Sequence, residues 1–206
     1  FAITGTVAGV ALLLAAVLGG RFAAGWYFLY PLPLRGQWAP WATVTFFAAL
    51  AVLGVTWLVW CLDLLRAIAR RYRLSEALGW HYIGGRREPA VPPSVLITTV
   101  SLIVCVACLV SAVLVLAFFS RELLGGPPTD ALLMKNLTFF FGHVLVNLSL
   151  YLGVALVYET LPEYASRSWP ANRVVAISWN AVLVIVLLAY FHHLYMDFAQ
   201  PAVLQY

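Results

Sequence analysis

Three of the four histidines occupy positions from which they could bind one metal ion. His143 follows the first residues of an apolar stretch, and His192 and His193 stand together at the end of the next apolar stretch. If the two stretches are antiparallel transmembrane helices, the beginning of one lies beside the end of the other. A helix that starts near Leu137 carries His143 roughly 9 Å along its axis, at the depth of the histidine pair. Three neutral imidazoles suit copper, zinc or non-haem iron, so the spacing predicts a metal site.

The composition places these histidines in a membrane protein. Of the 206 residues 64% are hydrophobic and 10% are charged, and the mean hydropathy is +0.93. A soluble domain of this length needs more charge to cover its surface. The net charge of +4 would suggest a nucleic-acid partner in a soluble protein. Here the arginines lie between apolar stretches, so we expect membrane lipid and no nucleic acid as a partner.

Five apolar stretches are long enough to cross the hydrocarbon core, which takes roughly 20 helical residues. They are separated by segments rich in proline and glycine. Backbone in lipid must satisfy its own hydrogen bonds, and runs of this length do so only as helices. The sequence therefore predicts an all-α, polytopic membrane helix bundle in a single membrane domain over residues 1–206. The expected spans are residues 1–20, 43–65, 95–119, 137–161 and 174–194.

The distribution of arginines indicates the orientation of the bundle. Six lie between the second and third spans and two between the fourth and fifth, whereas only four cationic residues face the opposite side. An excess of arginine marks the cytoplasmic side, so we expect a multi-pass protein of a bacterial or archaeal inner membrane. The chain also opens without methionine inside an apolar run and closes soon after another, which leads us to expect a fragment of a longer protein.

Two motifs around the histidines resemble a known family. The sequence Phe-Gly-His at 141–143, an unbroken apolar run after it, and Ala-Tyr-Phe-His-His at 189–193 resemble the catalytic subunit of haem–copper oxidases, a cytochrome c oxidase subunit I-like protein. The segment 30–38 (YPLPLRGQW) is similar to an outer loop of the B-type branch, and so is 62–66 (LDLLR) at the end of the second span. The resemblance covers most of the chain and leaves the counterpart of the first span open.

The resemblance implies a ligand set and a set of partners. His143, His192 and His193 would hold the active-site copper, or non-haem iron in some members. The full-length subunit, of twelve or more helices, would carry two haems whose ligands lie outside this segment, so we expect no haem ligand here. Electrons would come from a donor subunit, cytochrome c or quinol, and the substrate would be a gas, O₂ or NO.

Asn147 departs from the pattern of most oxygen-reducing members. They carry a tyrosine four residues after the first copper histidine, which supplies an electron and a proton when the O–O bond breaks. Positions four apart share a helix face, so Asn147 should face the same metal, but an amide cannot form a phenoxyl radical. Nitric oxide reductases lack this tyrosine, and we therefore favour NO over O₂. An oxidase whose tyrosine lies elsewhere in the chain stays open as an alternative.

Two further residues in the fourth span suggest a proton path. Tyr158 matches a tyrosine in the proton path of B-type oxidases, as the resemblance implies. Glu159 is a candidate entry group, because a carboxyl that titrates near neutrality can relay protons into an apolar interior. The competing interpretation of Glu159 is an interfacial glutamate paired with an arginine such as Arg167.

Two other classes of function remain open at this level. A transporter or channel could use the histidines for protons or for a transported metal, but it would be expected to have discontinuous helices. A non-catalytic structural subunit would leave three matched histidines without a role. The cysteines favour neither class: Cys105 and Cys108 lie in mid-span among aliphatic residues, where small packing residues are expected, and Cys61 stands alone in the second span.

Overall fold

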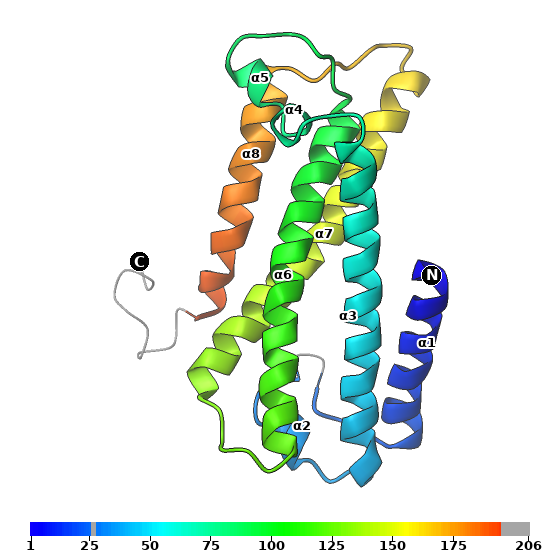
Figure 1. The fold of residues 1–206 in the computed structure, drawn as a ribbon, viewed down its shortest axis with the longest axis vertical. Helices are drawn as coiled ribbons and strands as arrows, with labels where there is room; N and C mark the ends of the chain where they lie inside the picture. The colour runs from blue at the N-terminus through cyan, green and yellow to red at the C-terminus, as the bar shows by residue number, and fades with distance from the viewer. Residues whose placement is uncertain (26–27, 195–206) are drawn as a thin grey trace. The chain divides into compact units, whose positions relative to one another are not determined.

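All the regular secondary structure in the part of the chain that its structure describes is helical. The structure is a computed structural model and describes residues 1–25 and 28–194, and within these ranges it has no strand. The elements, in chain order, are α1 (Ala2–Leu14), the π-helix η1 (Ala15–Gly19), α2 (Leu32–Arg35), α3 (Pro40–Ala69), α4 (Leu74–Ala77), α5 (Trp80–Ile83), α6 (Pro93–Leu123), α7 (Ala131–Tyr164), α8 (Arg173–Leu188) and the 3-10 helix η2 (Ala189–Leu194) (Figure 1).

The predicted all-α membrane helix bundle is confirmed. In the described residues five helical segments are long and apolar enough to cross a membrane. Each coincides with one of the five stretches expected from the sequence. Their bounds are Ala2–Gly19, Pro40–Ala69, Pro93–Leu123, Ala131–Tyr164 and Arg173–His193.

The prolines mark the helix ends differently from the prediction. Pro40 and Pro93 were expected to lie between spans, but they are the first residues of α3 and α6. Proline suits the first turn because its missing N–H has no partner there in any case. Pro162 was expected to end the fourth span, and this was wrong: α7 continues to Tyr164. The carbonyl of Pro162 accepts a hydrogen bond from the backbone of Arg167 (3.0 Å), which closes the last turn beyond the proline.

The chain divides into two compact units, and residues Phe1–Trp60 with Cys108–Gly142 form the first. Its core contains Phe22, Phe46, Phe47, Phe119 and Met134 among other buried residues. The rings of Phe22 and Phe46 stack with centroids 4.3 Å apart, and those of Phe47 and Phe119 with centroids 5.3 Å apart. This unit contains none of the histidines.

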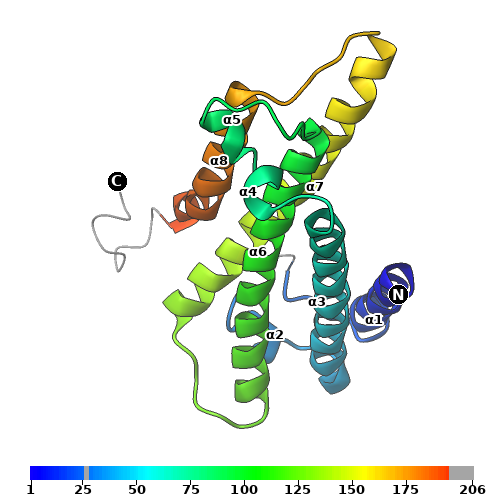
Figure 2. The same ribbon diagram turned by 45° about the horizontal axis from the view of Figure 1, so that its top comes forward.

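The second unit comprises residues 61–107 and, within the described part, 143–194. All four histidines belong to it. Its buried core joins the first turns of α6 to α7, α8 and the segment between α3 and α6, through Leu96, Val100, Ala155, Ala176 and Trp179. Figure 2 shows the short helix α5 beside the first turns of α8, where the two elements are in contact.

Cys61 has no second cysteine in its own helix, but it has one as a neighbour in the fold. Its sulfur lies 3.4 Å from the sulfur of Cys105, so a cysteine of α3 and a cysteine of α6 are in direct contact. Both side chains are buried, as the packing role expected for the mid-span cysteines requires. Sequence spacing could not reveal this pair because its members lie on different helices.

Gly79, between α4 and α5, offers a test of how the second unit is packed. Gly79 has φ +71°, and a Cβ there would lie 2.6 Å from Cδ1 of Leu96; Gly85 has φ +82° and open space around it. Gly85→Ala should lower the free energy of unfolding by about 1 kcal/mol, from backbone strain alone. Gly79→Ala should cost a further 1–3 kcal/mol or so, because the added methyl overpacks the core. Unfolding of the purified protein in mixed micelles measures both, and equal losses would contradict the packing described for Gly79.

Candidate metal centre

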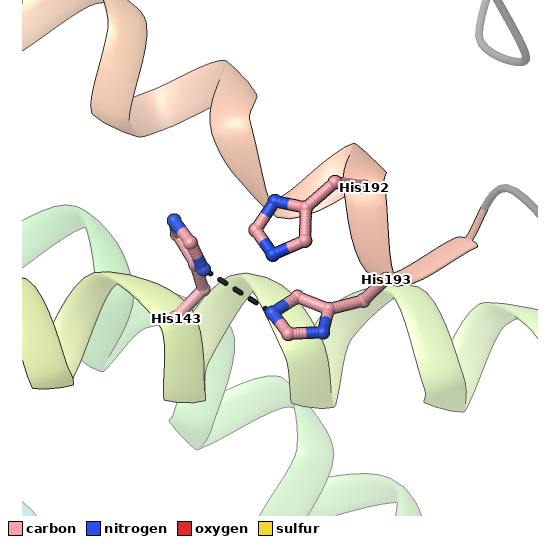
Figure 3. Close-up of side chains that lie close together, drawn as sticks. All are labelled: His143, His192 and His193. Carbon is pink, nitrogen blue, oxygen red and sulfur yellow. Dashed lines mark hydrogen bonds between the residues drawn. The ribbon is translucent and has the colours of Figure 1, made fainter.

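Two neighbouring elements of the second unit carry the three histidines. His143 lies in α7 and is half-buried, while His192 and His193 lie in η2 and are exposed. The chain tightens from an α-helix to a 3-10 helix at Ala189, just before the pair. Figure 3 shows the imidazoles of both adjacent residues reaching toward the ring of His143.

The imidazoles lie close enough to share one ion. Nδ1 of His143 is 3.2 Å from Nε2 of His193 (Figure 3). The ring of His143 lies 4.8 Å from that of His192 and 5.3 Å from that of His193, measured between centroids. One ring nitrogen from each histidine lies within 4.8 Å of the other two. The convergence expected from the sequence is therefore present.

A backbone contact orients one of the three rings. Nδ1 of His192 is hydrogen-bonded to the carbonyl oxygen of Ala189. A carbonyl can only accept, so this contact places the proton on Nδ1 and leaves a lone pair on Nε2. Contacts of this kind commonly fix the tautomer of histidines that bind metal.

The donor set fits a small transition-metal ion. Nitrogen ligands at 2.0–2.1 Å from a tetrahedral ion lie about 3.4 Å apart, close to the separation of His143 and His193. The widest separation has to shrink from at most 4.8 Å, which the exposed rings of η2 can accommodate by turning. His143 and His193 must also lose the proton that they share, as metal binding requires. Among the described residues no cysteine or carboxylate joins the group, so three imidazoles would leave a coordination position open.

Asn147 lies one turn beyond His143 on α7. Its amide Nδ2 donates a hydrogen bond to the carbonyl oxygen of His143 (2.9 Å). This bond occupies a donor of the amide with the helix backbone. The amide keeps Oδ1 as an acceptor, but it has no acidic proton to give.

The structure does not bring Tyr158 and Glu159 to the histidines. They lie 15 and 16 positions further along α7, roughly 23 Å at the rise of an α-helix. The ring of Tyr158 stacks on Trp169 with centroids 4.6 Å apart. Oε2 of Glu159 accepts a hydrogen bond from the hydroxyl of Ser94 (2.5 Å), at the first turn of α6. Within the described residues Glu159 has no ion pair with Arg167 or another arginine.

Sequence reasoning missed Ser94 and the carbonyl of Ala189. Ser94 stands directly after a proline pair, which marks the start of α6. The start of one helix lies beside the end of an antiparallel neighbour, here α7 with Glu159. This relation is the signal from which the pairing of Ser94 with Glu159 could have been predicted. The Ala189 contact depends on the change to a 3-10 helix, for which the sequence gives no signal.

The fourth histidine, His81, lies in α5, and neither of its buried ring nitrogens has a hydrogen-bond partner within the described residues.

Comparison with known proteins gives one result for the whole chain. The family model described as cytochrome C and Quinol oxidase polypeptide I matches residues 1–206. Comparisons with curated proteins and with solved structures gave no match.

Proposed function

The chain belongs to the family of cytochrome c and quinol oxidase polypeptide I, and from this premise we propose that it is part of the catalytic subunit of a respiratory haem–copper reductase. The family is one of oxidoreductases, and the five apolar helices make the chain a multi-pass membrane protein. The observation that carries the proposal is the convergence of three histidines from α7 and η2. The two haems of the whole subunit would be held by ligands outside residues 1–206.

We infer that His143, His192 and His193 hold copper or, as in some members of the family, non-haem iron. An ion held there would supply one-electron redox chemistry and an open position for a small gas molecule. The chain contributes three neutral imidazoles to that end. His192 is oriented by the Ala189 carbonyl, and His143 is carried by the rigid helix α7.

The environment of Asn147 supports NO as the substrate. Coupling two NO molecules needs only two electrons, whereas breaking the O–O bond needs an extra electron and proton close to the gas. A phenol supplies both, but the Asn147 amide supplies neither, and one of its N–H groups already bonds to the His143 carbonyl. The runner-up function is a dioxygen-reducing, proton-pumping oxidase that takes its tyrosine from another part of the chain.

The contact between Glu159 and Ser94 supports a proton entry at the opposite end of α7. The carboxylate is exposed, so it can take a proton from water, and its hydroxyl partner on α6 is half-buried. Tyr158 is half-buried beside it and packs on the core of the second unit. A hydroxyl both accepts and donates, so Ser94 and Tyr158 can pass a proton without changing charge.

The remaining partners follow from this function. Electrons would come from a donor subunit, cytochrome c or quinol, and the membrane would be the inner membrane of a bacterium or an archaeon. The transporter alternative gains no support from the fold, because α3, α6 and α7 run without a break. The matched histidines likewise argue against a structural subunit without chemistry.

Gas consumption by the purified full-length complex tests the substrate. We expect rapid loss of NO and slow uptake of O₂ under the same reductant.

Replacing His143, His192 or His193 by alanine should reduce NO turnover by at least a hundredfold and leave the low-spin haem spectrum intact, because the haem ligands lie elsewhere. His81→Ala, a matched histidine outside the group, should keep the wild-type rate. Full activity in any of the three alanine variants would contradict the site, and rapid O₂ uptake would select the oxidase.

The proton entry has its own test. Glu159→Gln and Ser94→Ala should each slow steady-state turnover by about tenfold or more, because a relay group is lost. Glu163→Gln changes an exposed glutamate one turn further along α7 and serves as the matched control. The measurement is turnover against pH together with metal content, which should stay unchanged in all three variants. Equal rates in Glu159→Gln and Glu163→Gln would remove Glu159 from the path.

A further inference from the structure

The segment between α3 and α6 is folded into a platform on the second unit. We use the term platform for residues 70–92, which include α4 and α5. Its residues Leu78, Tyr82 and Val91 are buried in the core, and the hydroxyl of Tyr82 accepts a hydrogen bond from the backbone N–H of Val91 (2.8 Å). The platform therefore has a fixed inner face.

Asn180 of α8 joins the platform to the helices. Its Oδ1 accepts a hydrogen bond from the indole of Trp80 (2.9 Å), and its Nδ2 donates to the carbonyl of Leu78 (2.8 Å). The same Nδ2 also donates to the carbonyl of Ala176 on its own helix (2.8 Å). Both ends of the amide are thus satisfied, and they hold α5 against α8.

The outer surface of the platform is cationic and partly apolar. Every arginine on it, and the one in the last turn of α3, is exposed; these are Arg66, Arg70, Arg71, Arg73, Arg86 and Arg87. Three large apolar side chains share this surface: Leu74, Trp80 and Ile83 are 58%, 53% and 36% exposed.

These positive charges have no acidic partner within the described part of the chain. The two glutamates of the platform use carboxylate oxygens on backbone N–H groups: Glu76 accepts from Arg73 (2.8 Å) and Glu88 accepts from Ala90 (3.0 Å). Arg71 lies over the ring of Tyr72, and in the described ranges none of the six guanidinium groups forms an ion pair.

We propose that the platform binds the headgroups of anionic phospholipids. The arginines lie within seven residues of the ends of the spans Pro40–Ala69 and Pro93–Leu123. At such span ends we expect the phosphate layer of the membrane. Guanidinium groups bond phosphate oxygens through two N–H groups at once. An indole and two aliphatic side chains suit the boundary between headgroups and acyl chains, whereas a nucleic acid or an acidic protein surface would leave them exposed.

The test compares two matched pairs of arginines in the purified full-length complex. The platform variant is Arg70→Gln/Arg73→Gln. The control is Arg21→Gln/Arg35→Gln, which removes two exposed arginines outside the platform and the same total charge. Each complex is placed in nanodiscs of phosphatidylglycerol and phosphatidylcholine, extracted with mild detergent, and its retained lipids are counted by mass spectrometry.

We expect the wild type and the control to retain phosphatidylglycerol over phosphatidylcholine. In the platform variant the ratio of retained phosphatidylglycerol to phosphatidylcholine should fall roughly fivefold for each arginine removed, and about twenty-five-fold for the pair. Arg70→Lys/Arg73→Lys, which keeps the charge, should retain most of the preference and shows that the fold tolerates changes at both positions.

Three results would overturn the proposal. The platform variant could keep the wild-type preference, or the control could lose as much as the platform variant does. Alternatively, removing an accessory subunit from the wild type could abolish the preference, which would assign the platform to a protein partner.

Discussion

Lipid offers no hydrogen bonds, and this constraint governs both the fold and the candidate metal centre. A backbone group left without a partner in the hydrocarbon core costs several kcal/mol, so five apolar segments become helices. The polar side chains obey the same rule. Asn180 satisfies both ends of its amide, and the three imidazoles of α7 and η2 meet one another. On the function proposed above, a metal ion would complete the last group, because it would give each imidazole lone pair a partner that lipid cannot supply.

The rigidity of the site follows from where its histidines stand. His143 belongs to a helix of 34 residues, which fixes the position of its backbone. The pair belongs to a short 3-10 turn, where one ring is oriented by the carbonyl of Ala189 and both rings are exposed. One fixed ligand and two that can turn suit a centre that must tighten around an ion.

Much of this arrangement could be predicted from the sequence because both its causes are local. Apolar runs set the five spans, and the spacing of His143 and the histidine pair set their common depth. The details that the sequence did not reveal depend on contacts between distant segments or on backbone geometry. Cys61 lies against Cys105 across two helices, α7 runs through Pro162, and Glu159 pairs with Ser94 instead of Arg167. None of these leaves a periodic signal, because each arises from how helices pack and end.

The claim that three histidines share one redox metal is tested most directly by X-ray absorption at the copper and iron edges of the purified full-length complex. The account predicts one non-haem ion, copper or iron, with three nitrogen scatterers at about 2.0–2.1 Å whose outer shells are those of imidazole. In His143→Ala the ion should be lost or should keep two imidazoles. A wild-type complex without a non-haem ion, or one whose ion keeps its full imidazole shell in His143→Ala, would contradict the account.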